Sequence, residues 1–573
     1  MISRRHVLLS GGVAAIGSAA KGPTEAREAM VSAASAPAVD VGVEILKRGG
    51  NAVDAAVAVG FAEAVTWPAA GNIGGGGFML IQMAGGKSAV IDYRETAPRR
   101  AHRDMYRGAD GKPDGRLSTV GHLSCGVPGT VAGLALAHRK FGALRWREVI
   151  APAVALARDG FALDENSAGM LHRSAKLLGQ FPESNRIFLR GGRHYAGGEM
   201  LRQPELSATL ERIAKKGPAE FYEGETARML VEEMRRGGGW IEAADLRAYR
   251  AVERLPLRGS YRGNEIVSLP PTASGGAVLL AMLNMLEGYD LAKMRSGSVE
   301  RFHLLAEVMK RAFADRSAYI GDPAFVKAPI RGMISKAYAR ERAAGIDLKR
   351  ATPAGEIRQG EPARHESSET THFSVVDGQG NAVSNTYTLR NGFGSGVTVA
   401  GAGFLLNDVM DDFATQPGQP NTFGFVAGEA NAIAPGKRPV SSQTPTIVNK
   451  GGVNKGGKLW FALGSPGGPT ISNTVLQVIL NVIEDGMDLQ QAVDAPRVHH
   501  QWTPDILGYE GGGLTKETIA ALEAMGHAVR TTSRDGSATG GFGQVNAVGV
   551  NLETGARTGA NDRRNPSGKA AGY

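Results

Sequence analysis

The spacing of hydrophobic positions changes near residue 370, from a mainly helical period to a mainly strand period. Before that point, residues 38–47 follow a proline and end before two glycines, which predicts a helix. Residues 53–65 are almost all apolar, which predicts a helix buried between layers. Two apolar runs at residues 78–83 and 89–93 predict a pair of strands.

The helical period dominates from about residue 128 to about residue 350. Apolar residues recur there at three-and-four spacing in segments 130–138, 146–158, 208–215 and 301–319. The polar stretch 349–369 contains prolines and glycines without a period, which predicts an exposed loop. Beyond it, the pattern predicts a hairpin of residues 371–377 and 382–389, strands at 446–448 and 459–463, and a helix over 469–484.

The composition is ordinary for a soluble globular protein of 573 residues, a length that predicts two domains or one large layered unit. The formal net charge is +9, but basic and acidic residues alternate and form no stripe, which argues against a nucleic-acid partner. Cys125 is the only cysteine, so no intrachain disulfide forms, and we expect it to be a small buried residue.

Residues 1–20 have the pattern of an export signal. Arg4 and Arg5 precede a short apolar run that extends to Ile16 and is followed by small residues, which is typical of a twin-arginine signal. The run is too short and too rich in glycine to span a membrane, and no other segment is apolar for about eighteen residues. We therefore expect an exported protein, periplasmic or extracellular, without a membrane partner.

Several familiar motifs are incomplete in this chain. The glycine-rich stretch 71–77 leads into a strand and not a helix, so it does not fit a dinucleotide loop. Gly-Lys-Ser at 86–88 lacks the leading glycine of a phosphate loop, because Ile81 stands there. No Gly-x-Ser-x-Gly or His-Glu-x-x-His pattern occurs. The adjacent His499 and His500 point apart in extended structure, so we expect neither a metal site nor a cofactor.

Thr370 begins a predicted strand directly after the exposed loop. A threonine hydroxyl is a poor nucleophile unless a base lies beside it, and a free α-amine on the same residue can be that base. Cleavage between Glu369 and Thr370 would create this amine. Taken alone, Thr370 and Thr371 also fit two ordinary β-branched strand residues.

Glycines precede a proline at the start of the predicted helix 469–484. The sequence Leu-Gly-Ser-Pro-Gly-Gly-Pro at 463–469 leaves unpaired backbone N–H groups at a helix start. Such groups can stabilise an oxyanion on a substrate carbonyl. A plain strand-to-helix turn has the same sequence features.

With both features in view, the chain resembles the gamma-glutamyltransferase (glutathione hydrolase) family from about residue 29 to residue 573. The most specific element is Thr-Thr-His-Phe-Ser-Val-Val-Asp at 370–377, which is similar to the start of that family's small subunit. Supporting stretches are Gly-Val-Pro-Gly-Thr-Val-Ala-Gly at 126–133, Met-Asp-Asp-Phe at 410–413, Arg-Pro-Val-Ser-Ser at 438–442 and Ala-Pro-Arg at 495–497.

The resemblance implies an α+β fold of the N-terminal-nucleophile hydrolase type, with four αββα layers and two stacked, mainly antiparallel sheets. It implies a precursor that cuts itself before Thr370 into a large subunit of residues 21–369 and a small subunit of residues 370–573. The Thr370 hydroxyl is then expected to attack a gamma-glutamyl amide and pass the acyl group to water, an amino acid or a peptide.

The same resemblance implies roles for other residues of the site. Thr388 matches the threonine that orients the nucleophile, and the backbone of Gly467 and Gly468 matches the oxyanion hole.

For the substrate, Arg94 matches the arginine that holds the glutamyl α-carboxylate. A guanidinium suits that role because its donors can pair with both carboxylate oxygens. Ser441 and Ser442 match hydroxyls beside that carboxylate, and Asp412 matches the partner of the α-ammonium.

Two positions depart from the family pattern. Arg390 stands where typical members have an asparagine that contacts substrate, and Val409 stands where they have glutamine or glutamate near the α-amine. The site therefore loses an acceptor for an ammonium group and gains a positive charge, which favours an acid without that amine, such as a glutaryl group. Residues 417–435 resemble the lid loop of some members, with Phe423 at the gating position, or an exposed loop with an incidental aromatic.

Three functions are therefore in view. The first is a gamma-glutamyl hydrolase or transferase that acts on glutathione-like peptides. The second is a glutaryl- or cephalosporin-type side-chain acylase on the same scaffold. The third is a binding protein that does not mature, against which the presence of Thr370, Thr388 and the glycine pair argues.

Overall fold

The computed structural model describes residues 22–108, 111–112, 114–362, 374–421, 424–451, 457–532 and 541–573. Three predictions fall outside these residues: the export signal over 1–20, the cleavage site at Glu369 and Thr370, and the aromatic Phe423. They stay predictions. Within the described ranges, no helix is long and apolar enough to cross a membrane.

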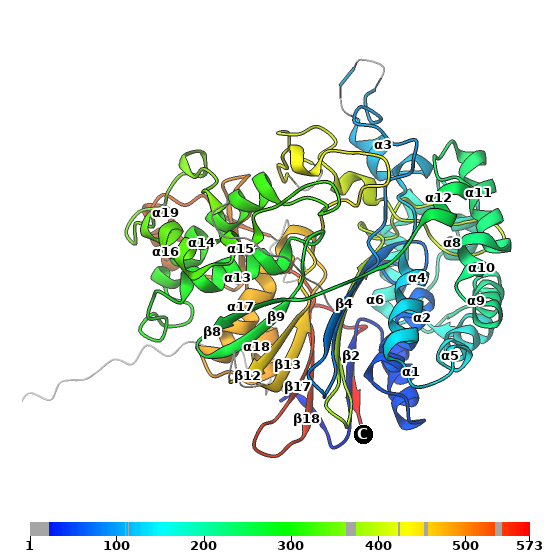
Figure 1. Ribbon diagram of the computed structural model, residues 1–573, viewed down its shortest axis with the longest axis horizontal. Coiled ribbons are helices and arrows are strands. Elements are labelled where there is room, and N and C mark those ends of the chain that lie inside the picture. The colour runs from blue at the N-terminus through cyan, green and yellow to red at the C-terminus, as the bar shows by residue number, and fades with distance from the viewer. Residues whose placement is uncertain are drawn as a thin grey trace, which may run out of the picture.

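Two seven-stranded sheets form the centre of the molecule (Figure 1), and every strand pair in them is antiparallel. The first sheet has the order β1 (Thr24–Ala26), β18 (Arg557–Asn561), β17 (Asn546–Val550), β13 (Lys458–Gly464), β12 (Thr446–Lys450), β9 (Asn264–Ser268) and β8 (Leu257–Tyr261). The second has the order β19 (Lys569–Gly572), β2 (Met30–Ala33), β10 (Ser374–Val376), β11 (Ala382–Thr388), β3 (Gly76–Gln82), β4 (Ser88–Asp92) and β7 (Val252–Arg254).

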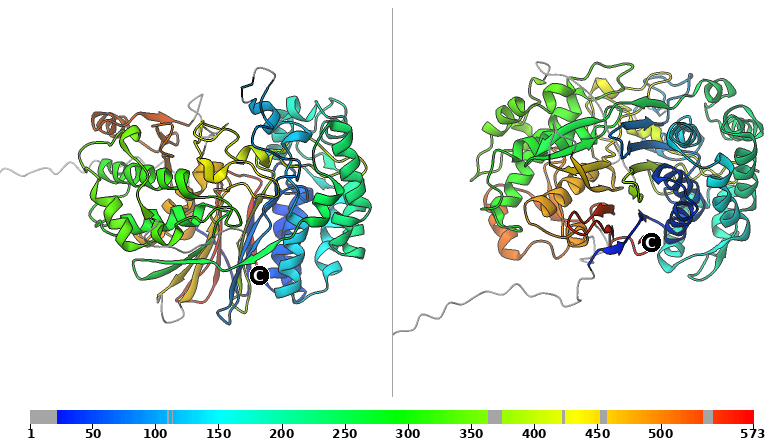
Figure 2. Two further views of the ribbon diagram at one scale, coloured as in Figure 1. Left: turned by 45° about the horizontal axis from the view of Figure 1, so that its top comes forward. Right: turned by 60° about the horizontal axis from the view of Figure 1, so that its bottom comes forward.

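Helices cover the outer faces of both sheets, as Figure 2 shows from two further sides. The second sheet packs against α1 (Ala36–Lys47), α2 (Ala52–Thr66), α4 (Thr130–Phe141), α5 (Trp146–Asp159) and α9 (Pro204–Lys216), which share one apolar cluster with it. The first sheet packs against α13 (Gly275–Leu286), α14 (Val299–Tyr319), α17 (Ile471–Ile483) and α18 (Leu489–Asp494). These four layers confirm the predicted αββα fold.

The remaining elements are short helices and two small sheets around this body. The helices are α3 (Gly115–Thr119), α6 (Glu165–Arg173), α7 (Ala175–Leu178), α8 (Pro182–Leu189), α10 (Ala219–Glu223), α11 (Glu225–Gly237), α12 (Ala243–Ala248), α15 (Ile330–Met333), α16 (Lys336–Ala344) and α19 (Lys516–Ala524). The strands β5 (Phe161–Ala162) and β6 (Met200–Leu201) pair with each other, and β14 (Val498–His499), β15 (Leu507–Tyr509) and β16 (Val529–Thr531) form a three-stranded sheet.

Strand β3 shows why the sheets stack face to face. Its alternate side chains point to opposite faces, so Phe78 and Leu80 enter the apolar cluster between the two sheets, while Met79 and Ile81 enter the cluster beneath the helices. Because both faces of the strand are covered, it is apolar from Gly76 to Ile81 and has no polar side there. Every residue of α2 is likewise buried, which confirms the prediction from its apolar sequence.

Three strands within the mainly helical stretch were not predicted. Residues 252–268 form β7, β8 and β9, which extend both sheets. Their pairing with β4 and β12 brings in partners that are distant in the sequence, and a local pattern carries no signal for such partners. The predicted helix over 469–484 is a 3₁₀ turn at Gly468–Thr470 followed by α17.

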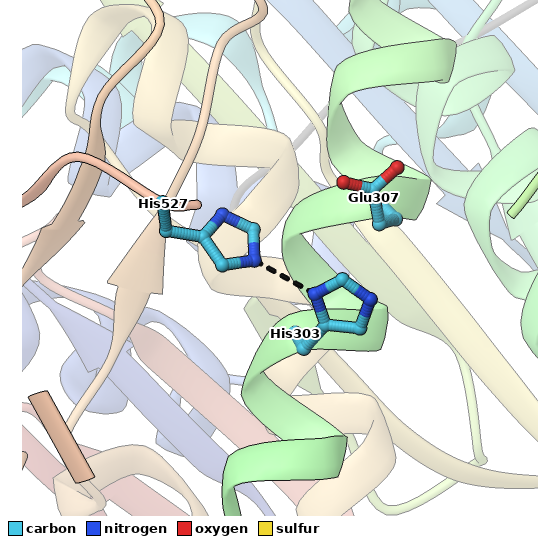
Figure 3. A group of neighbouring side chains, drawn as sticks. All are labelled: His303, Glu307 and His527. Carbon is cyan, nitrogen blue, oxygen red and sulfur yellow. Dashed lines mark hydrogen bonds between the residues drawn. The ribbon is translucent and has the colours of Figure 1, made fainter. Parts of the chain in front are cut away.

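A buried histidine pair ties α14 to the segment after α19 (Figure 3). His303 Nε2 lies 2.8 Å from the carbonyl oxygen of Asp347, so it donates, and its bare Nδ1 accepts the proton of His527 Nε2 at 2.8 Å. Glu307 lies beside this pair and already binds Lys310, Arg311 and the backbone N–H of Thr352.

Among the described residues, these two histidines and Glu307 have the spacing of metal ligands. The two imidazoles are bonded to each other and the carboxylate is neutralised by two cations. We therefore read the cluster as a closed hydrogen-bond network and not as a metal site.

This network predicts acid-sensitive stability. Burial, followed by the nearby Lys310 charge, lowers the pKa of His527 to about 3 from 6.5. Between these pH values His527 is neutral in the folded protein and protonated in the unfolded chain. Stability contributed by neutral His527 is therefore present above pH 6.5 and is lost as the pH falls toward 3. His527→Gln removes this uptake and should reduce the acid-induced loss between pH 6.5 and pH 4 by about 2–3 kcal/mol in urea unfolding.

His102→Gln is the matched control, because His102 is exposed and lies outside the network. Its acid dependence should equal that of the wild type. An acid dependence of His527→Gln that is as steep as the wild type's would contradict the argument.

Candidate active site

A cavity of about 290 Å³ brings together seven of the residues predicted from the sequence. The residues that line it include Thr388, Arg390, Asp412, Ser441, Ser442, Gly467 and Gly468. They come from the end of β11, the 3₁₀ helix Val409–Asp412, the loop before β12 and the turn between β13 and α17. Segments far apart in the sequence thus meet at one end of the two sheets.

Thr388 closes β11 and holds its hydroxyl in a defined orientation. Its Oγ1 accepts the backbone N–H of Arg390 at 2.8 Å. A hydroxyl oxygen that accepts one bond keeps its own proton for another acceptor. Thr388 is therefore able to donate a hydrogen bond to a group placed beside the end of the strand.

The turn before α17 is built for close approach of a carbonyl oxygen. Gly467 and Gly468 have φ values of 136° and 57°, in the region that favours glycine, and a Cβ on Gly467 would meet Thr470 Oγ1 at 2.5 Å. In the described part of the chain, neither amide N–H donates to an acceptor. Two free N–H groups at the start of a helix have the geometry that an oxyanion hole requires, and the oxyanion role of the two glycines stays a prediction.

Arg94 does not line the cavity. Its side chain is fully buried, and its guanidinium donates to the carbonyl oxygen of Pro439 at 3.2 Å, to Glu95 at 3.1 Å and to Asp412. It therefore lies behind Asp412, with its donors already engaged. Its predicted role as a direct carboxylate ligand stays a prediction.

Arg390 lines the cavity but its charge is compensated. Its Nε donates to Asp412 at 2.7 Å, and its two other nitrogens bind Asp411 and Asp408. Burial raises the pKa of Asp408 to about 7, against the lowering effect of Arg390. The arginine thus neutralises an acidic cluster that would otherwise be costly to bury.

Val409 is completely buried and does not line the cavity. It lies on the 3₁₀ helix that also carries Asp412, against the backbone of Gly126. A glutamine at this position would need a different side-chain direction to reach a substrate.

Several residues that line the cavity were not predicted from the sequence. Arg316, at the end of α14, and Gln443 contribute polar groups, and Trp67 and Phe425 contribute aromatic surface. Phe425 belongs to the predicted lid segment, which therefore borders the cavity. A single arginine in an amphipathic helix is usually exposed to solvent. Only the packing of α14 in the folded protein shows that Arg316 lines the cavity.

Two other sequence candidates have structural roles. Burial raises the pKa of the Cys125 thiol to about 12, which excludes a thiolate nucleophile. His499 contacts Asn473 and Gln501, whereas His500 contacts Asp505. The two imidazole rings therefore do not face a common point at which both could bind one metal ion.

Comparison with known proteins places this site in a family. The sequence profile of the Gamma-glutamyltranspeptidase family matches residues 38–573. The chain is 47% identical to a glutathione hydrolase proenzyme of Escherichia coli, over 96% of this chain and 93% of that protein. It is 39% identical to the Acylase ACY 1 proenzyme of a Pseudomonas species, strain SE83, over 94% and 93%.

A solved structure shares the architecture. The cephalosporin acylase of Bacillus halodurans superposes with a TM-score of 0.85 at 26% identity and covers 99% of both chains. Because the family profile and a relative of nearly half-identical sequence both extend over almost the whole chain, this protein belongs to the gamma-glutamyltranspeptidase family.

Proposed function

We propose that this protein is an exported, self-processing enzyme that cleaves gamma-glutamyl amides such as glutathione through an acyl-enzyme on Thr370. The family membership and the proenzyme relatives support a gamma-glutamyl hydrolase and transferase made from a precursor. The observation that carries the proposal is the cavity in which Thr388 faces the same space as Gly467, Gly468 and the serine pair.

The sheet register supports the identity of the nucleophile. Val375 pairs with Val383, and Val376 pairs with Ala382. β10 begins at Ser374, shortly after Thr370 in the sequence, and its partner β11 ends at Thr388, so we propose that the Thr388 hydroxyl orients the Thr370 nucleophile.

The proposed maturation uses the same groups as catalysis. The Thr370 hydroxyl attacks the carbonyl carbon of Glu369, and the C–N bond breaks to leave an ester. Water hydrolyses this ester, which releases the Glu369 carboxylate and leaves Thr370 with a free α-amine.

In turnover, the α-amine takes the Thr370 hydroxyl proton while the oxygen attacks the substrate carbonyl. The amides of Gly467 and Gly468 donate to the oxyanion that forms. The α-amine then returns the proton to the leaving nitrogen, and water or an amine accepts the acyl group from the ester.

The first test is the covalent state of the purified protein. Intact-mass analysis with N-terminal sequencing should find a second chain that begins at Thr370, and Thr370→Ala should remain one chain without activity because it lacks the attacking oxygen. Thr370→Ser retains a hydroxyl and should still split. A wild-type chain that stays whole, or a cut at another bond, contradicts the proposal.

The second test addresses Thr388. Thr388→Val removes the donated hydrogen bond and should lower kcat about 10- to 100-fold, the range for a hydrogen bond to a developing charge. Thr388→Ser keeps the hydroxyl and should stay near the wild type, with both variants compared after confirmed processing. Equal kcat values for the valine and serine variants would show that the hydroxyl has no role.

A second candidate function is cleavage of glutaryl amides. Both carboxylate oxygens of Asp412 already accept guanidinium groups, one from Arg94 and one from Arg390. An α-ammonium therefore competes with two cations for this carboxylate, whereas a glutaryl group has no ammonium to place. The acylase relative is consistent with such chemistry on this scaffold.

Kinetics distinguish the two substrates. The kcat/KM of glutaryl p-nitroanilide should exceed that of gamma-glutamyl p-nitroanilide. The double variant Arg390→Asn with Val409→Gln should raise gamma-glutamyl activity about tenfold, which is the effect expected from one restored hydrogen bond. Arg390→Lys, which keeps the charge, is the matched control and should not gain this activity. A large gamma-glutamyl preference in the wild type, or no gain in the double variant, rejects the second candidate.

A further inference from the structure

Trp67 is the most buried of the five tryptophans in this chain. Its exposed fraction is 7%, whereas the other four are only partly buried. Trp146 and Trp502 donate their indole N–H groups to backbone carbonyl oxygens, at 3.1 Å and 2.9 Å. Within the described chain, the Nε1–H of Trp67 has no acceptor. A buried indole N–H usually has a hydrogen-bond partner, so this free donor indicates a place for a ligand.

The free N–H of Trp67 faces a cavity. Trp67 lines the active-site cavity and also a smaller cavity of about 80 Å³ beside it. Nε1 is not one of the fully buried polar atoms that lack a partner in the described ranges, so it faces this open space. The backbone around Trp67 is fixed, because its N–H donates to Glu63 at 2.8 Å and its carbonyl oxygen accepts the N–H of Gly71 at 2.8 Å. The indole therefore belongs to a preformed wall.

This wall separates the two cavities and is free of charged side chains. The described residues that line both cavities are Trp67, Ala70, Thr386, Tyr387, Pro466 and Gln544. By contrast, the charged and serine side chains line only the larger cavity, and they are Arg316, Arg390, Asp412, Ser441 and Ser442. One end of the active-site cavity is therefore charged, and the end at Trp67 is neutral and mainly apolar.

The groups proposed for the reaction lie next to the shared wall. Thr388 directly follows Thr386 and Tyr387 on β11, and Gly467 directly follows Pro466 in the turn before α17. A substrate carbonyl placed at Thr388 and Gly467 has the charged end of the cavity on its acyl side. Its leaving amine then extends toward Trp67.

We propose that Trp67 binds the leaving amine of the substrate. Its ring packs against an apolar side chain of that group, and its N–H donates to the first carbonyl oxygen beyond the scissile nitrogen. This inference rests on the proposed function, because it requires an amide that is cleaved at this site. Since the shared wall offers no cation to a carboxylate, it fits a neutral amide with an apolar side chain. An accepting amine takes the place of the leaving amine, so acceptors follow the same preference.

The test compares three gamma-glutamyl amides that differ only in the leaving amine. Phenylalaninamide has an aromatic side chain and a carbonyl, phenethylamine lacks the carbonyl, and glycinamide lacks the side chain. The measured quantity is the change in each kcat/KM ratio between wild type and variant, in which the different basicities of the amines cancel.

Two substitutions separate the ring from its N–H. Trp67→Phe keeps an aromatic ring, so it should lower the ratio of phenylalaninamide to phenethylamine about 5- to 10-fold and leave the ratio of phenylalaninamide to glycinamide unchanged. Trp67→Ala also removes the ring, so it should lower the ratio to glycinamide about 10- to 30-fold as well. Trp67→Phe still decides the role of the N–H if the alanine variant does not fold.

Three results would overturn the proposal. They are an unchanged phenethylamine ratio in Trp67→Phe, an unchanged glycinamide ratio in Trp67→Ala, and an equal loss for all three substrates. The last would mean that Trp67 only shapes the cavity.

Trp146→Phe is the matched control, because it removes an indole N–H that binds Ile213 away from both cavities. It should leave all ratios unchanged. Glutaryl amides of the same three amines should give the same ratios.

If the wild type cleaves neither acyl series, the proposed function fails, but the role of Trp67 is still measurable. Free phenylalaninamide should then raise the Tm of the wild type and not that of Trp67→Ala. Equal stabilisation of the two proteins would overturn the proposal.

Discussion

The position of β10 between β2 and β11 is the constraint on which the rest of this structure depends. The strand begins directly after the segment that contains Thr370, and both of its edges are paired in the centre of the second sheet. A central strand is held by backbone hydrogen bonds on two sides and by apolar clusters on two faces. β10 and its partner β11, which ends at Thr388, are therefore held in one register.

The same constraint would keep the two proposed subunits together. Strands from both sides of the loop alternate through the sheets: β2 and β3 flank the β10–β11 hairpin, and β8 and β9 extend the sheet that contains β12. Cutting the loop removes one covalent bond but leaves all of these pairings and the shared apolar layers. The proposed processing would thus create a new N-terminus without exposing a sheet edge.

The charges around the cavity divide into two groups with different tasks. Asp408, Asp411 and Asp412 surround Arg390, with Arg94 behind Asp412, so these charges largely satisfy one another. Arg316 is oriented by Ser274 and Phe425, and the Asp412 carboxylate partly offsets the lowering of its pKa by burial. A closed network of ion pairs thus positions one wall of the site, and an oriented cation lies in another.

The sequence alone determined the local elements and the chemistry of single positions. The almost entirely apolar α2, the hairpin after the loop and the glycine pair before α17 follow from periodicity and turn residues, which act over a few positions. The motif at 370–377 indicated the family and the fold and predicted the nucleophile. Only the tertiary structure decided that residues 252–268 are strands, that Arg94 lies behind Asp412 and that Arg316 reaches the cavity. These outcomes depend on residues that lie hundreds of positions away in the sequence. The local sequence pattern contains no information about how such residues pack, form hydrogen bonds and balance charge.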